Sequence, residues 1–251
     1  MMECLLSLKL SKFFPFYAHQ IYAQKCRKED IMKKHLLSLL LICSMLVFLT
    51  GCGKDFDASG YVQGYMDTCL KGDGTNYAEL CGVSEEETTE VYEEGIDEVV
   101  DGWLTGVSLS DESKSEVESA VKALFKKTSY SVGKAEKQDD GSYSVPVTIQ
   151  PLEIKLDTAA MQDLQTETMS QYMEAHPEDE SLSDTEALGN LLATEFAAYL
   201  TNISENPTYA EEVTKNVTVS IQDKQYMLSE EDQYTLITSS VATGTESTEI
   251  E

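Results

Sequence analysis

One apolar stretch, ending in Leu49-Thr50-Gly51-Cys52, constrains this chain more than any other feature. Two lysines, Lys33 and Lys34, precede it, and residues 36–49 are almost entirely apolar. A basic start, an apolar segment of roughly 7–15 residues and small residues at the cut are typical of a secretory signal peptide. Because the cysteine follows the small residues directly, we predict a lipobox, with signal cleavage before Cys52 and a lipid on its thiol.

The alternative interpretation of the apolar stretch is a transmembrane helix. A membrane span needs about 20 apolar residues, and the segment 36–49 is shorter. We therefore expect an extracellular lipoprotein, held at the outer face of the cytoplasmic membrane by acyl chains such as palmitate on Cys52. A single acyl chain binds only marginally, at about 0.8 kcal/mol per buried methylene, whereas two chains give a stable membrane anchor.

The signal peptide sets the predicted domain organisation. Met32 followed by two lysines is a typical lipoprotein start, so we expect translation to begin there and residues 1–31 to be an untranslated extension. The parts predicted after it are a signal peptide over 32–51, a lipidated N-terminus with a short tether over 52–56, one domain over 57–241, and a disordered tail over 242–251.

The charge of the predicted mature chain limits its partners. The chain has 18 Lys and Arg and 45 Asp and Glu, of which 7 and 3 precede Cys52, so residues 52–251 carry 11 Lys, 42 acids and no Arg. Nucleic-acid binding needs a cationic face, and bidentate capture of phosphate favours Arg. We expect no nucleic-acid partner. A cationic or other envelope partner remains compatible, as does the simpler view that the charge only keeps the surface soluble.

Two cysteines besides Cys52 belong to the predicted mature chain, Cys69 and Cys81. In an extracellular setting they are a candidate disulfide. Two small buried thiols are the equally good alternative. Cys69 falls on the apolar face of the first predicted helix, which favours the second interpretation slightly without deciding between the two.

The periodicity of the chain predicts an α+β fold. Apolar residues recur at helical spacing after Asp57, Ser84, Ser110, Asp157, Ser183 and Ser229. Ser84 with Glu87 and Ser183 with Glu186 match the capping box. The period changes to two over 130–137, 143–154 and 213–221, with a hairpin turn at Asp139-Asp140-Gly141 and a change of parity at Pro151. We predict a small antiparallel sheet, a hairpin plus a returning third strand, packed against about six helices.

Side chains that carry out catalysis or bind metals are scarce. His176 is the one histidine after residue 51 and stands in an acidic segment, whereas triads need a positioned histidine and zinc needs several His or Cys ligands. The acidic groups Asp139-Asp140 and Glu178-Asp179-Glu180 do not match the spacing of a calcium loop. We predict no catalytic residue, no metal and no cofactor.

Several segments resemble a group of uncharacterised lipoproteins of Gram-positive anaerobic Firmicutes. They are the lipobox, Phe56-Asp57-Ala58-Ser59-Gly60-Tyr61-Val62, Lys71-Gly72-Asp73, Ser84-Glu85-Glu86-Glu87 and the segment 217–234. The resemblance covers most of 54–241 and implies a cell-surface location and a cystatin-like or NTF2-like α+β fold. It implies no activity, because its motifs are caps, turns and core residues.

Our leading hypothesis from the sequence is a non-enzymatic envelope binding or structural module, attached to the membrane through the lipid on Cys52. The first alternative is a carbohydrate-active hydrolase, which would need a cleft with two acids about 5–10 Å apart. The second is a solute-binding lipoprotein, which the predicted single small domain disfavours. A disulfide between Cys69 and Cys81 stays open in all three.

Overall fold

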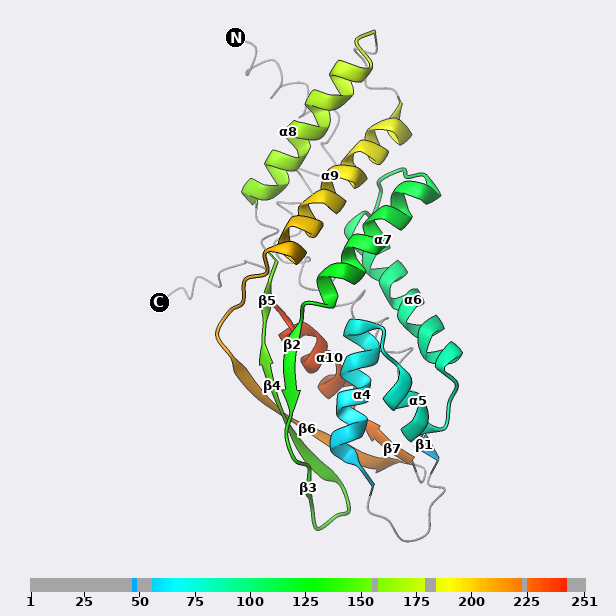
Figure 1. The fold of residues 1–251 in the computed structure, drawn as a ribbon, viewed down its shortest axis with the longest axis vertical. Helices are drawn as coiled ribbons and strands as arrows, with labels where there is room; N and C mark the ends of the chain where they lie inside the picture. The colour runs from blue at the N-terminus through cyan, green and yellow to red at the C-terminus, as the bar shows by residue number, and fades with distance from the viewer. Residues whose placement is uncertain (1–46, 49–55, 155–157, 179–183, 223–224, 243–251) are drawn as a thin grey trace.

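The computed structural model describes residues 47–48, 56–154, 158–178, 184–222 and 225–242 (Figure 1). These ranges contain seven α-helices and an antiparallel main sheet, so the α+β prediction is confirmed. The helices are α4 (Ala58–Lys71), α5 (Thr75–Cys81), α6 (Glu85–Trp103), α7 (Asp111–Phe125), α8 (Thr158–Ala175), α9 (Thr185–Glu205) and α10 (Glu230–Ser239).

The main sheet runs in the order β1-β7-β6-β4-β2, and the short strand β3 also pairs with β4. Every pairing in it is antiparallel. Its strands are β1 (Val47–Phe48), β2 (Ser129–Val132), β3 (Glu136–Lys137), β4 (Tyr143–Gln150), β6 (Val213–Gln222) and β7 (Gln225–Leu228). The predicted third strand, β6, pairs along β4, and β7 then extends the sheet beyond the three strands that we expected.

The change of parity at Pro151 marks the end of the sheet strand, as predicted. Along β4 every second residue is buried, from Tyr143 to Ile149. After Pro151 the chain forms β5 (Leu152–Glu153), which pairs in parallel with β8 (Val241–Ala242) in a separate two-stranded sheet. Residues 143–153 therefore contribute one strand to each of two sheets. Pro151 lies between the two strands and has no backbone N–H to donate.

Two hydrophobic clusters divide the domain. In the first, α4 and α10 pack on the main sheet through residues such as Tyr65, Val145 and Leu236. In the second, α6, α7 and α9 pack together with β5, and α8 contributes Leu164. Figure 1 shows the sheet at one end of the long axis and the α8–α9 pair at the other.

Most helix starts follow the predicted caps. Asp57, Ser110 and Ser229 each accept a hydrogen bond from a backbone N–H of the first turn. Ser84 and Glu87 form the full capping box, and these hydrogen bonds hold the pKa of the Glu87 carboxyl below its usual range. Such caps satisfy donors that have no partner inside the helix.

The capping box predicted at Ser183 is wrong. Helix α9 is capped one residue later by Asp184, whose carboxylate accepts from the Ala187 backbone N–H. Ser183 itself and Asp157, the cap predicted for α8, lie outside the described residues. An anionic cap also interacts favourably with the positive end of the helix dipole, which explains the preference for Asp184.

Several short elements were not predicted from the sequence. One is β8, which includes Ala242, where the disordered tail was predicted to begin. Helix α5 spans 7 residues and β7 spans 4, too few for a periodic pattern to emerge. Strand β1 was not predicted either. It lies inside the segment predicted to be the signal peptide. The structure contains the whole chain, so β1 is present here, whereas the predicted cleavage before Cys52 would remove it.

Candidate functional site

The predicted lipidation site, Leu49-Thr50-Gly51-Cys52, lies outside the described residues. The described chain resumes at Phe56, whose ring stacks on Tyr226 of β7 with centroids 3.9 Å apart and planes 11° apart. Fully extended, the four residue steps from Cys52 to Phe56 span about 14 Å. The place where the domain would be anchored is therefore fixed at the β7 end of the sheet.

Phe56 belongs to an aromatic cluster of five side chains: Phe56, Tyr61, Tyr77, Tyr143 and Tyr226. Ring centroids lie 5.7 Å apart between Phe56 and Tyr61, and 5.8 Å apart between Tyr143 and Tyr226. The four tyrosines are at most 8% exposed. Because aromatic pairs in such geometries add about 0.5–1.5 kcal/mol each beyond burial, the cluster holds the start of the domain firmly against α4, α5, β4 and β7.

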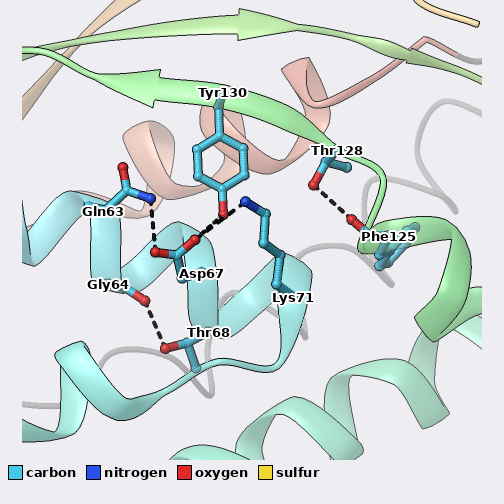
Figure 2. A network of polar contacts seen from close by, with 8 residues as sticks. All are labelled: Gln63, Gly64, Asp67, Thr68, Lys71, Phe125, Thr128 and Tyr130. Atoms are coloured by element: carbon cyan, nitrogen blue, oxygen red, sulfur yellow. Dashed lines mark hydrogen bonds and ion pairs between the residues drawn. The ribbon is translucent and has the colours of Figure 1, made fainter.

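A second group of polar side chains joins helix α4 to strand β2 (Figure 2). The Tyr130 hydroxyl donates a 2.7 Å hydrogen bond to Oδ1 of Asp67, and the Gln63 amide donates a 2.8 Å bond to Oδ2. The Lys71 ammonium lies 3.6 Å from the same Oδ1 and 4.3 Å from the centre of the Tyr130 ring. We call these four residues the Asp67 network.

The Asp67 network favours a structural role over a chemical one. Both carboxylate oxygens of Asp67 already accept hydrogen bonds, and the Lys71 charge compensates the carboxylate. Burial, followed by the hydrogen bond to Asp67 and its negative charge, raises the pKa of Tyr130 far above its usual range. The phenol therefore stays protonated at neutral pH and donates to Asp67. Through this hydrogen bond the network holds β2 against α4.

The Asp67 network was not predicted from the sequence. Its spacing on the helix is visible, because Gln63, Asp67 and Lys71 stand four residues apart and such residues are neighbours on a helix. Tyr130, however, is 63 residues away from Asp67. No local pattern indicates that pairing.

A hollow of about 410 Å³ lies against the first turns of α6 and is lined by Glu85, Glu86, Thr89 and Glu90. These four side chains come from one helix and are exposed. The geometry that a glycosidase requires is a pair of carboxylates facing each other across a cleft. This hollow lacks that geometry, so it gives the hydrolase alternative no support.

Of the predicted acidic groups, Asp139-Asp140 forms a turn and Glu178 is exposed, while Asp179 and Glu180 lie outside the described residues. Asp140 accepts hydrogen bonds from the backbone N–H and hydroxyl of Ser142, at 3.0 and 2.6 Å, which lower the pKa of its carboxyl. His176 is exposed after the end of α8 and stacks on Tyr172 at 4.6 Å between centroids. In the described part of the chain, no group of three or more His, Cys, Asp or Glu is arranged to hold a metal ion.

Cys69 and Cys81 are both buried in the first hydrophobic cluster, at 1% and 4% exposure. The structure has no disulfide between them. Burial raises the pKa of the Cys81 thiol to about 12, against a smaller opposite effect of the hydrogen bond with Tyr77. A thiol with a pKa that high is a poor nucleophile at neutral pH.

Helices α6 and α7 meet through a row of charges. The Lys114 ammonium lies 2.5 Å from Asp97 and 2.6 Å from Asp101, and Lys122 pairs with Glu93. Glu118 stands between the two lysines on α7. Its pKa is raised by burial first and then by the charge of Asp97, although the lysines partly oppose this.

None of the helices in the described ranges is long and apolar enough to cross a membrane. No family model and no curated protein matches this chain. Its fold is similar to that of YcdA of Bacillus subtilis, a candidate lipoprotein with a crystal structure, at a TM-score of 0.50 and 18% identity. The match covers 75% of this chain and 57% of YcdA, so this chain spans a little over half of that protein's length. At this identity the likeness establishes a similar fold alone.

Proposed function

We propose that this protein is a lipid-anchored lipoprotein of the cell surface that acts by binding an envelope partner and not by catalysis. The single observation that carries the proposal is the lipobox ending at Cys52, four residues before the ring of Phe56 that packs on Tyr226. A lipid attached there joins the folded domain almost without a linker.

Two further observations support a lipoprotein. The fold is similar to that of the candidate lipoprotein YcdA. The main sheet also packs on one side against α4, an arrangement compatible with the cystatin-like or NTF2-like fold that the resemblance to Firmicutes lipoproteins implies. We extend the proposal to that group and to an extracellular location.

The charge supports a binding role for the domain. Residues 52–251 carry 42 acidic residues against 11 lysines, so the domain attracts cationic surfaces and is repelled by anionic headgroups. The lipid is then the membrane attachment, and a cationic protein or peptide of the envelope is the kind of partner that the domain attracts.

Metabolic labelling with an alkyne analogue of palmitate tests the anchor. We expect the wild-type protein to be labelled and to stay with salt-washed membranes. Cys52→Ser should lose the label and either enter the medium or stay uncleaved. Cys43→Ser is the matched control, because it changes a cysteine of the signal peptide outside the lipobox. Membrane retention of a cleaved, unlabelled Cys52→Ser protein would contradict the proposal.

The binding role needs a separate test. The immobilised mature protein should retain a basic envelope component more strongly than a control protein of equal net charge does. Equal retention by the two would mean that the charge acts without a specific surface, and the domain would then be a spacer.

A further inference from the structure

Strand β1 occupies the outer edge of β7. Val47 pairs with Tyr226 and Phe48 with Gln225, both antiparallel. Residues of β1 also contact helix α5. The backbone of β1 thus lies between β7 and α5, a place that we call the β7 slot, and Figure 1 shows all three elements together.

This inference rests on the proposed function, in which the signal peptide is cleaved before Cys52. After that cleavage the signal segment cannot stay in the β7 slot. Cleavage before Cys52 removes Val47 and Phe48 from the chain. Strand β7 then becomes an edge of the main sheet, since β6 lies on its other side. An edge strand presents unpaired N–H and C=O groups, which pair readily with another extended chain.

We propose that the β7 slot of the mature protein accepts an extended apolar segment of a partner chain by β-strand addition. In this mode the backbone ladder provides affinity, and the side chains at alternate positions provide specificity. The precursor shows the geometry, because an antiparallel Val-Phe segment of this chain is seated there.

The residues around the β7 slot favour an apolar occupant. Tyr226 and Leu228 of β7 are 8% and 1% exposed, and Tyr77 of α5 is 2% exposed. Phe56 stacks on Tyr226 beside them. Tyr77, Tyr226 and Leu228 belong to the first hydrophobic cluster, and an apolar strand paired with β7 would extend that cluster past the sheet edge.

A second copy of this chain is the less suitable occupant. Two mature chains, each with 42 acids and 11 lysines, repel each other at short range. A partner segment flanked by lysines or arginines would be attracted by the same charge. The occupant is therefore an extended apolar segment with basic flanks.

Site-directed crosslinking tests this proposal on the mature lipoprotein in detergent, after its intact mass has established the N-terminus. The probe is a synthetic peptide of residues 44–50 with two lysines at each end and Phe48→Cys. It is offered to the Gln225→Cys protein, because Phe48 and Gln225 are opposite residues in the precursor. Ser131→Cys on β2, which is exposed at the other side of the sheet, is the matched control.

We expect a mixed disulfide with Gln225→Cys and at least tenfold less with Ser131→Cys. A peptide methylated on the backbone nitrogens of residues 46–49 should crosslink at least tenfold less, because it keeps its side chains but cannot form the ladder. In the wild-type protein, the unmodified peptide should slow hydrogen exchange at the amides of 225–228. This second measurement does not depend on the folding of a variant.

Three results would overturn the proposal: equal crosslinking at the two positions, equal crosslinking by the methylated peptide, or unchanged exchange over 225–228. A peptide-free dimer crosslinked through Gln225→Cys would assign the slot to a second copy and overturn it as well. The intact mass separates this failure from failure of the proposed function, since a chain that retains residues before Cys52 would show that the signal peptide is not cleaved.

Discussion

The hydroxyl of Tyr130 and the carboxylate of Asp67 form a 2.7 Å hydrogen bond that joins strand β2 to helix α4 across 63 residues of sequence. The bond is half-buried and involves a charged acceptor, and such bonds contribute about 1.5–3 kcal/mol. It adds a directional contact to the apolar packing of α4 on the sheet.

Tyr130→Phe should lower the free energy of unfolding by about 1–3 kcal/mol, because Asp67 loses a half-buried hydrogen-bond donor. Urea denaturation measures the change. In a double-mutant cycle with Asp67→Ala, the coupling energy should be about 1 kcal/mol or more. Tyr209→Phe is a matched control, since its hydroxyl donates to the exposed Lys127 carbonyl, and it should change stability less. A coupling energy near zero would contradict the role of the Asp67 network.

Stability should fall at alkaline pH partly through Cys81. Burial raises the pKa of this thiol from 9.0 to about 12, so the unfolded chain loses the proton first. The stabilisation is complete below pH 9 and is lost as the pH rises from 9 to 12, by about 1.4 kcal/mol per unit at most. Thermal unfolding of Cys81→Ala over this range should have a smaller slope than the wild type, and an unchanged slope would refute the assignment.

Glu118→Gln should stabilise the protein at neutral pH by up to about 1 kcal/mol, a small effect because the site is only half-buried. The Glu118 pKa is raised by burial and by the nearby Asp97, so its charged form is unfavourable in the folded state. The advantage of the variant should shrink as the pH falls and the wild-type carboxyl takes up its proton. Denaturation at pH 7 and pH 4 compares the two, with the exposed Glu116→Gln as control.

Gly189→Ala should destabilise the contact of α9 with the segment before α7. A Cβ at Gly189 would overlap the carbonyl oxygen of Ser108, which belongs to the backbone and cannot rotate away. Overpacking of this kind costs about 1–3 kcal/mol. Thr201→Ala, at an exposed position of the same helix, controls for helix propensity. A melting temperature of Gly189→Ala that equals that of the control would show that the backbone there adapts freely.

Local chemistry explains what the sequence predicted correctly. The caps at Asp57, Ser84 and Ser110 and the strand break at Pro151 depend on residues within one turn of each other. The alternating burial along β4 depends on a period of two. Patterns of this range are complete within a short window of sequence.

The features that the sequence did not predict depend on contacts between residues that are far apart in the sequence. Strand β7 is 4 residues long and becomes a strand because β6 offers it an edge. The partner of Asp67 is chosen by the packing of α4 on the sheet, which brings Tyr130 within reach. The stack of Phe56 on Tyr226 likewise joins residues 170 positions apart in the sequence, and no local pattern indicates it.

That stack has a consequence for where the molecule can meet other molecules. With the proposed lipid on Cys52, the domain would have at most about 14 Å of chain between its first packed ring and the bilayer. Under that proposal it would meet partners by lateral diffusion in the plane of the membrane and not by diffusion through a volume. How often it meets a partner then depends on how many copies share each unit of membrane area.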